Sequence, residues 1–275
     1  MRKNVSMSVV LASAALALFA CSPARAEPVK APPAAAPAAK TDFRYAKVLP
    51  AGQKVSIRNI IGTIRAELSS SNTLEVLATK VSEGGDPALV RIVANESAAG
   101  VTVCVLYPNS GDRCEGASHG RQGALHEDPR VRVEFVVRVP AGLAFEAANV
   151  SGNIEARGLR SDVRVTAVSG NVEVSTSSGA VEAKSVSGTV RVAMGAPREG
   201  VASSASAVSG SVEVKLPAQS NFDAEAKTVS GEIETEFGLP VQKGFVGQNL
   251  RGRVGKGGAQ LRLETVSGGI RLSRG

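Results

Sequence analysis

The chain has 275 residues and a formal net charge of +7, with 32 Lys and Arg residues against 25 Asp and Glu residues. Aromatic residues make up 3% of the chain and tryptophan is absent, so the aromatic platforms of many carbohydrate sites are missing. Basic and acidic residues alternate along strand-like runs, which is typical of a solvated strand face and not of a nucleic-acid stripe. We therefore expect no nucleic-acid partner.

Residues 1–26 have the organisation of a secretory signal peptide. Arg2 and Lys3 precede an apolar run at residues 9–20, which is too short to remain in a membrane as a spanning helix. We therefore predict export from a bacterial cytoplasm to the periplasm, the outer membrane or the cell surface.

Two processing sites compete at the end of this segment. The sequence Ala-Arg-Ala at 24–26 is an A-x-A site, and cleavage there makes residues 1–26 the signal peptide. The sequence Leu-Phe-Ala-Cys at 18–21 resembles a lipobox, in which case the signal peptide is residues 1–20 and Cys21 is lipidated. The sequence leaves both sites open, and a lipid on Cys21 is the one membrane contact that we expect.

Residues 27–44 are rich in proline and alanine and show no apolar periodicity. This composition predicts an extended linker between the signal segment and the folded part. The Val, Ser, Gly and Thr bias of the rest of the chain favours strands over long helices.

Residues 45–140 are predicted to form an N-terminal β region. Four runs in it have the composition of strands, at residues 73–80, 89–95, 100–107 and 131–139. We expect these runs to form antiparallel hairpins that cap or interrupt a larger repeat, because an uncovered end strand exposes unpaired backbone groups.

Cys104 and Cys114 lie close together in this region, and in an exported protein such a pair predicts a disulfide. Closing so short a loop should stabilise the fold by about 3 kcal/mol on the chain-entropy argument. A metal or redox site is the alternative, and it would need a third ligand. His119 and His126 are available but share no ligand spacing, so we predict no metal and no cofactor.

The pentapeptide Gly-Ala-Ser-His-Gly at 116–120 matches the G-x-S-x-G pattern of serine hydrolases, with Ser118 as the nucleophile. In that pattern a buried strand delivers the serine to the start of a helix. Here the pentapeptide follows Cys114 in a polar stretch without helical periodicity, which favours an accidental match.

Residues 141–275 contain a repeated Val-Ser-Gly tripeptide, which begins at Val150, Val168, Val186, Val208, Val229 and Val266. A degenerate copy, Ile-Ile-Gly, ends at Gly62. Successive copies are 18, 18, 22, 21 and 37 residues apart, which is the scale of solenoid repeats, and the last step holds an insertion or an irregular turn.

The apolar alternation changes phase at each tripeptide. Val163, Val165 and Ala167 share one parity, whereas Val168, Gly170 and Val172 share the other, and we expect both sets to point inward. A phase change at a fixed place predicts a coil of two strands that meet at a bend. The bend glycines should stack from coil to coil and the serines should face outward; the glycines are Gly62, Gly152, Gly170, Gly188, Gly210, Gly231 and Gly268.

These tripeptides, the Val-Pro-Ala-Gly at 139–142 and the Cys-Val-Leu-Tyr-Pro at 104–108 with Cys114 resemble the bacterial putative-adhesin family from about residue 45 onward. The resemblance implies an envelope protein with a β-solenoid domain. It implies no catalytic residues, since the family has none to transfer.

The sequence as a whole predicts an all-β protein, a parallel β-solenoid of 18–22-residue coils capped or interrupted by N-terminal antiparallel strands. The predicted function is that of a non-catalytic envelope or surface scaffold, adhesin-like, with an unidentified protein or polysaccharide partner. A β-helix enzyme acting on polysaccharide, and a serine hydrolase using Ser118, are the alternatives.

Overall fold

The computed structural model describes residues 42–108, 114 and 130–275. The predicted signal segment with Cys21, the linker up to residue 41, and the loop residues Ser118, His119 and His126 lie outside the described residues. The described part belongs to one compact unit, Ala39–Gly275. In this part, no helix is long and apolar enough to cross a membrane.

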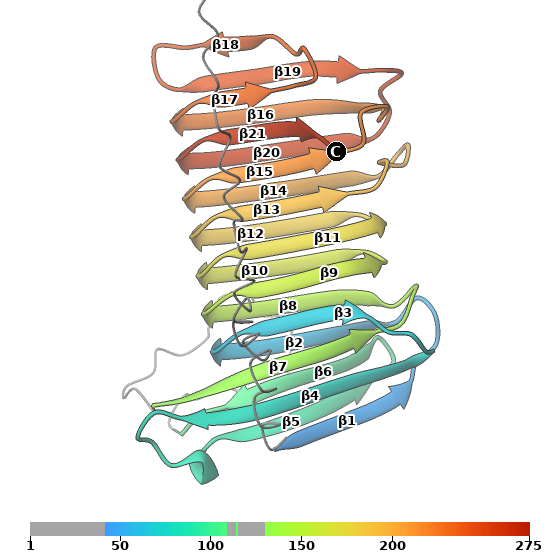
Figure 1. The fold of residues 1–275 in the computed structure, drawn as a ribbon, viewed down its shortest axis with the longest axis vertical. Helices are drawn as coiled ribbons and strands as arrows, with labels where there is room; N and C mark the ends of the chain where they lie inside the picture. Colours follow the sequence, from blue (N-terminus) through green and yellow to red (C-terminus); the bar gives the residue numbers. More distant parts are fainter. Residues whose placement is uncertain (1–41, 109–113, 115–129) are drawn as a thin grey trace, which may run out of the picture. The chain divides into compact units, whose positions relative to one another are not determined.

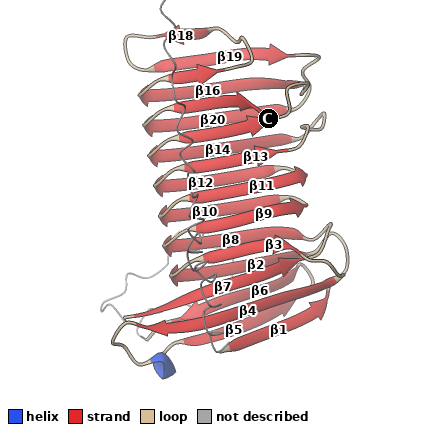
Figure 2. Cartoon of the chain, viewed as in Figure 1, coloured by secondary structure: helices blue, strands red, loops and turns tan. Residues whose placement is uncertain are grey.

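Two facing sheets make up this unit, together with one short 3-10 helix at Pro87–Leu89 (Figures 1 and 2). Sheet A has ten strands, which are, in spatial order, β1 (Phe43–Val48), β4 (Thr73–Ser82), β7 (Val131–Val139), β3 (Ile64–Leu68), β9 (Ile154–Arg160), β11 (Val172–Ser178), β13 (Val190–Met194), β15 (Val212–Leu216), β21 (Ile270–Arg274) and β17 (Ile233–Thr235). Sheet B has eleven, which are β18 (Val241–Lys243), β19 (Gln248–Val254), β16 (Phe222–Ser230), β20 (Gln260–Ser267), β14 (Ala202–Ser209), β12 (Val181–Ser187), β10 (Val163–Ser169), β8 (Ala144–Ser151), β2 (Lys54–Ile61), β6 (Gly100–Leu106) and β5 (Arg91–Ser97).

Each repeat is one coil, with its first strand in sheet B and its second in sheet A. The coils are β2–β3, β8–β9, β10–β11, β12–β13, β14–β15, β20–β21 and β16–β17. Neighbouring coils pair in parallel and in register, with Val163 beside Val181 in sheet B and Val172 beside Val190 in sheet A. The parallel β-solenoid predicted from the tripeptides is confirmed.

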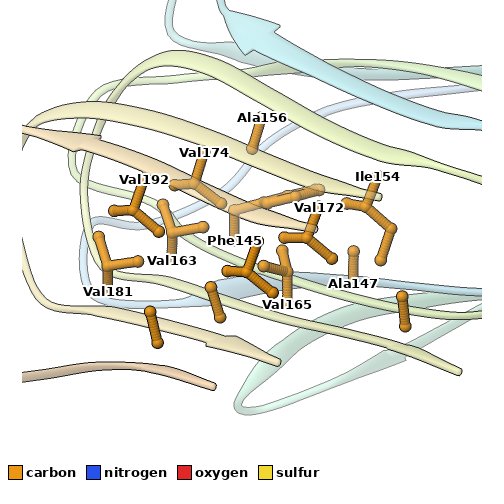
Figure 3. Close-up of a cluster of buried hydrophobic side chains, with 14 of the residues drawn as sticks. Phe145, Ala147, Ile154, Ala156, Val163, Val165, Val172, Val174, Val181 and Val192 are labelled. Atoms are coloured by element: carbon orange, nitrogen blue, oxygen red, sulfur yellow. The ribbon is translucent and has the colours of Figure 1, made fainter. Parts of the chain in front are cut away.

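The core lies between the two sheets and is built mainly of valine and alanine. Figure 3 shows Val163 and Val165 of β10 and Val172 and Val174 of β11 among the side chains of this layer, and all four are buried. Phe145 fills the larger space in the coil before them and is fully buried. Valine suits this place because its branched side chain has few rotamers to lose and packs well on a pleated surface.

The phase change occurs where the tripeptides predict it, but the valine of the tripeptide points outward. Val168 is 46% exposed and four of its counterparts are 42–49% exposed, whereas Val150 is half-buried, so the expectation that this valine is buried was wrong. The bend is spread over two outward residues: Val168 and Ser169 both face solvent, and burial resumes at Val172. Two successive outward residues change the parity in the way a bulge does.

At the N-terminal end, antiparallel strands cover the solenoid, as predicted. β4 pairs antiparallel with β1 and β7, and β5 forms an antiparallel hairpin with β6. β6 and β7 also run parallel to β2 and β3, so the cap continues both sheets.

The C-terminal end departs from chain order. The last coil, β20–β21, lies between β14–β15 and β16–β17, with β20 paired in parallel to both β14 and β16. Between β17 and β20 the chain forms a hairpin of β18 and β19. In this hairpin β19 pairs antiparallel with β16. The longest step between tripeptides therefore holds a hairpin that closes sheet B.

Candidate interaction surfaces

The bend glycines form a ladder in which backbone touches backbone. Gly170 has φ +147° and Gly188 has φ +144°, values that side chains rarely allow. A Cβ at Gly170 would overlap the carbonyl oxygen of Gly152, and one at Gly188 would overlap that of Gly170. The same overlap with the glycine of the adjacent coil occurs at Gly152, Gly210, Gly231 and Gly268, whereas Gly62 meets the carbonyl of Val133. We call this edge the glycine corner, and at its positions there is no room for a side chain.

A row of buried polar side chains supports the glycine corner from inside. Asn149 Nδ2 donates to the Gly62 carbonyl at 2.7 Å, and Ser185 Oγ donates to the Gly170 carbonyl at 3.0 Å. Thr265 and Thr228 donate in the same way to Gly210 and Gly268. These residues occupy one register position, and hydrogen bonding offsets the cost of burying their donor groups. In the described residues, the Asn149 Oδ1 atom is buried without a partner.

A charged row crosses the outer face of sheet B. One register position holds, from the N-terminal end, Glu146, Arg164, Glu182, Ser204, Arg262, Glu225 and Arg251. Arg164 lies 2.7 Å from Glu182, and Arg262 and Arg251 lie 3.2 and 2.6 Å from Glu225. Hydrogen bonds from Arg251 and then Arg262 hold the pKa of the Glu225 carboxyl below its usual range.

A shallow groove of about 860 Å³ follows the charged row near the starts of the strands. Acidic and basic side chains both line it, including Asp162, Glu182, Asp223, Arg251 and Arg262. Because the charges alternate, the groove does not present a single sign of charge to a polymer.

A second row lies next to the charged row, toward the strand ends. It holds Ala148, Thr166, Lys184, Ser206, Glu264, Lys227 and Asn249 at one register position. Beyond it runs the valine column, the five outward valines of the tripeptides: Val168, Val186, Val208, Val266 and Val229, which are 42–49% exposed. A groove of about 460 Å³ separates the second row from most of the valine column. A continuous apolar strip of this kind is a common sign of an interaction surface.

The outer face of sheet A carries a different charge order. Its central row reads Arg65, Glu155, Glu173, Arg191, Glu213, Arg271 and Glu234. Glu155 and Glu173 are neighbours of like charge, and Arg157 lies 3.3 and 3.4 Å from them, respectively. The charged residues of the solenoid are thus divided between two outer faces, and many of them are ion-paired on each.

The loop at 244–247, Gly-Phe-Val-Gly, joins β18 to β19 at the C-terminal end of sheet B (Figure 1). Phe245 is fully exposed and Val246 is 68% exposed. The core below is closed by other residues, since Phe237 packs edge-on against Phe222 with ring centroids 5.2 Å apart. The side chains of Phe245 and Val246 therefore lie outside this packing.

At the opposite end, the edge strands of the two sheets are joined by side chains. Tyr45 of β1 donates to Glu96 of β5 at 2.8 Å, and Lys47 of β1 also binds Glu96. Burial, with Glu96 as the second cause, raises the pKa of Tyr45 to about 12. Hydrogen bonds from Lys47 and then Tyr45 hold the pKa of Glu96 below its usual range.

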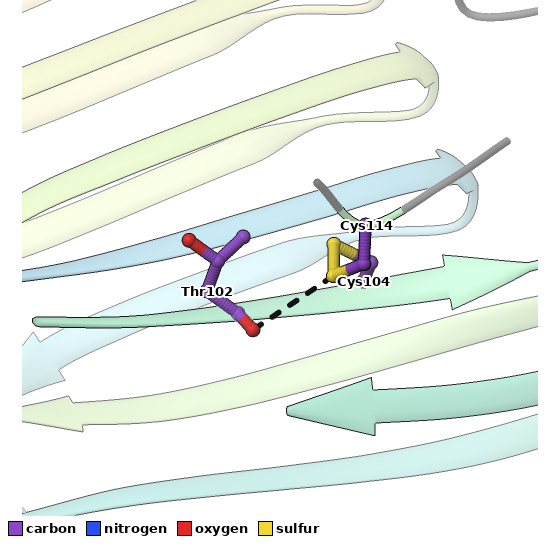
Figure 4. The surroundings of a disulfide bond; sticks show 3 residues. All are labelled: Thr102, Cys104 and Cys114. Atoms are coloured by element: carbon purple, nitrogen blue, oxygen red, sulfur yellow. Dashed lines mark hydrogen bonds between the residues drawn. A yellow bond between two sulfur atoms is a disulfide. The ribbon is translucent and has the colours of Figure 1, made fainter. Parts of the chain in front are cut away.

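Cys104 and Cys114 lie together, with their sulfur atoms 1.99 Å and their Cα atoms 5.7 Å apart (Figure 4). Cys104 is buried on β6, so the pair holds Cys114 against the N-terminal end of sheet B. The Cys114 sulfur lies 3.9 Å from the Thr102 carbonyl oxygen, and this is a contact only, because a disulfide sulfur carries no proton. Among residues 42–108, 114 and 130–275, no group of three or more His, Cys, Asp or Glu could hold a metal.

Sequence reasoning missed three features of these surfaces. The valine column was assigned to the core, and the order of charges across sheet B was not visible. Arg262 and Glu225 stand in reverse chain order because β20 lies between β14 and β16. The exposed Phe245-Val246 pair between two glycines is a local signal that could have been found.

Two solved structures are similar to this chain at 12% sequence identity. One is a putative cell adhesion protein from Clostridium sporogenes, with a TM-score of 0.34, covering 85% of this chain and 99% of that one. The other is a putative adhesin from Bacteroides fragilis, with a TM-score of 0.29, covering 84% of this chain and 96% of that one. No curated protein matches.

The family described as Toastrack DUF4097 matches residues 133–273. This range contains the six Val-Ser-Gly tripeptides, the glycine corner from Gly152 onward and most of the outer face of sheet B. It also covers more than half of the chain. The chain therefore belongs to the Toastrack DUF4097 family.

Proposed function

We propose that this protein is a non-catalytic, exported scaffold, adhesin-like, that carries the loop at 244–247 to a partner on an envelope or cell surface. The observation that carries the proposal is the position of that loop. The described chain begins at β1, the first strand of sheet A, and the loop lies beyond β16–β17, the last coil. Nine strand spacings in sheet A at ~4.8 Å place about 43 Å between the two ends.

The chemistry of the loop supports a contact role. An exposed phenylalanine beside an exposed valine is costly to leave in water and is typical of a contact site. The signal segment supports export, and the ion-paired outer faces support the absence of catalysis, since most of their carboxylates pair with arginine or lysine.

Adhesion of intact cells tests the proposal. The full-length chain would be expressed on a non-adherent bacterium, and cells retained on immobilised bacterial envelopes would be counted. We expect retention with the wild type and a loss of at least ~10-fold with Phe245→Ser plus Val246→Ser, because truncated apolar contact residues cost more than ~1 kcal/mol each.

A matched control replaces exposed apolar residues at the N-terminal end of the described unit. Val48 and Leu89 are 64% and 59% exposed, and Val48→Ser plus Leu89→Ser should leave retention unchanged. Equal retention by the wild type and the loop variant would contradict the assigned loop. Labelling of Ser118 by a fluorophosphonate, or unsaturated-sugar absorbance from uronate polymers, would contradict the non-catalytic assignment.

A further inference from the structure

Three rows of the outer face of sheet B, the charged row, the second row and the valine column, are complementary to themselves. In the row before them Asp162 and Asp223 stand two strands from β14 on opposite sides, and within their own chain Asp162 accepts from the Ala180 N–H and Asp223 pairs with Arg253. β14 is the centre of the pattern, and it contributes the small residues Ser204 and Ser206 to the charged row and the second row. One strand away on either side the charged row holds Glu182 and Arg262. The signs are therefore opposite at equal distances from β14.

The charges are also opposite on strands farther from β14. Two strands from β14 the charged row has Arg164 on one side and Glu225 on the other, and three strands away it has Glu146 and Arg251. The second row follows the same rule, because Lys184 and Glu264 stand one strand from β14 on opposite sides. In both rows, wherever charged residues stand at equal distances on the two sides of β14, their charges are opposite.

The valine column is symmetric about the same strand. Val208 belongs to β14, Val186 and Val266 lie one strand away, and Val168 and Val229 lie two strands away. The column therefore extends equally to both sides of β14.

We propose that two copies of the chain pair through the outer face of sheet B, about a two-fold axis that runs along β14, parallel to the strands. This operation places one face on the other, reverses the order of the coils and keeps each row opposite itself. It brings together Glu182 and the partner's Arg262, Arg164 and the partner's Glu225, Glu146 and the partner's Arg251, Lys184 and the partner's Glu264, and the valines of the two columns.

Within the pair, each of these matched charges gains a further neighbour of opposite sign. Arg164 already contacts Glu182 along its own row at 2.7 Å, and the partner's Glu225 approaches from the other face. Small serines at the centre allow the two sheets to come close. The strands of successive middle coils run nearly parallel in Figure 2, which lets the rows stay matched over several coils.

The outer face of sheet A shows that this complementarity is not a general property of alternating strands. β15 belongs to the same coil as β14, and a two-fold axis along it would oppose Arg191 with the partner's Arg271 and Glu173 with the partner's Glu234. Like charges opposite each other disfavour association.

The matched area is sufficient for a specific dimer. Seven strands, each about 4.8 Å wide, by three rows, ~20 Å wide, cover roughly 670 Å² on each copy, close to the ~800 Å² per partner of a standard interface. The dimer goes beyond the proposed adhesive role. It also carries one loop at 244–247 at each end, facing opposite ways.

Charge reversal tests the proposed contacts. The full-length chain would be purified in detergent, and its monomer–dimer constant measured by sedimentation equilibrium. We expect Glu182→Arg and Arg262→Glu each to weaken the dimer by at least ~10-fold, because each creates two like-charge contacts across the interface. The double variant restores opposite signs between copies and should return to within ~3-fold of wild type, although both reversals still disturb their own rows.

Cross-linking tests the position of the axis. Val208→Cys places a thiol at the centre of both copies, so a short bismaleimide spanning the ~10 Å between packed sheets should cross-link it into a dimer. Glu213→Cys, on the outer face of sheet A in the same coil, is the control and should stay at the wild-type level. The proposal is overturned if the wild type stays monomeric, if the double reversal is as weak as the single ones, or if Glu213→Cys cross-links as well as Val208→Cys.

Discussion

Besides the parallel strand ladders and the shared core, each coil meets its neighbour in two further ways: backbone against backbone at the glycine corner, and side chain against side chain on the outer faces. At the glycine corner a single Cβ has no space, since the carbonyl of the adjacent coil occupies it. On the outer faces the contacts are ion pairs between side chains that stay in water, such as Arg191 with Glu213. The difference indicates that the glycine corner constrains how the coils stack, whereas the residues of the outer faces can vary and can bind partners.

The largest effect should come from a side chain at the glycine corner. Gly170→Ala should lower the free energy of unfolding by roughly 3 kcal/mol or more, because it adds backbone overlap to a strained φ. Gly158 also has a positive φ, +66°, but nothing lies within 4 Å of its Cβ position. Gly158→Ala should therefore cost only about 1 kcal/mol. Urea unfolding of both variants measures the difference, and equal losses would show that overlap at the corner does not matter.

A smaller loss should follow from removing the support inside the corner. Thr265 is buried and donates to the Gly210 carbonyl at 2.9 Å. Thr265→Val keeps the shape and removes the donor, so it should cost about 1–2 kcal/mol. Thr166 faces outward on the second row, and Thr166→Val in the same unfolding experiment should change stability by less than about 0.5 kcal/mol. A neutral Thr265→Val would mean that the corner carbonyl does not need this hydrogen bond.

The Tyr45–Glu96 contact predicts a loss of stability at high pH. The pKa of Tyr45 is raised from 10.0 to about 12 in the folded state, so the folded state holds this proton more tightly than the unfolded state. The stability that results is present below pH 10 and is lost as the pH rises toward 12. We expect the stability difference between wild type and Tyr45→Phe to shrink over that window. A difference that stays constant from pH 9 to 12 would contradict the raised pKa.

The smallest effect should come from an ion pair on the outer face of sheet A. Arg191 lies 3.1 Å from Glu213, and the two side chains are 53% and 43% exposed. Arg191→Ala should change the free energy of unfolding by less than about 0.5–1 kcal/mol, because exposed pairs are screened by water and salt. A loss of unfolding free energy as large as that of Gly170→Ala would show that the outer faces contribute as much to stability as the glycine corner does.

Local patterns along the chain were sufficient to predict the coil. The alternation of Val163, Val165 and Ala167, the phase change and the recurring glycine identify two strands and a bend, because a strand buries every second residue wherever it lies. The same reasoning placed Val168 in the core and was wrong. Alternation cannot show whether a bend turns one residue outward or two, and that depends on how the backbone of the next coil is packed.

The sequence by itself determined that the chain is all-β, that it repeats in coils of about 20 residues, and that glycine is required at each bend. The tertiary structure alone decided which coils are neighbours. The insertion of β20–β21 between β14–β15 and β16–β17 brings Arg262 beside Ser204 and Glu225, and this order makes the charged row of sheet B complementary to itself. The physical reason is that strand pairing joins residues distant in the chain, and identical coil patterns fit more than one order of stacking.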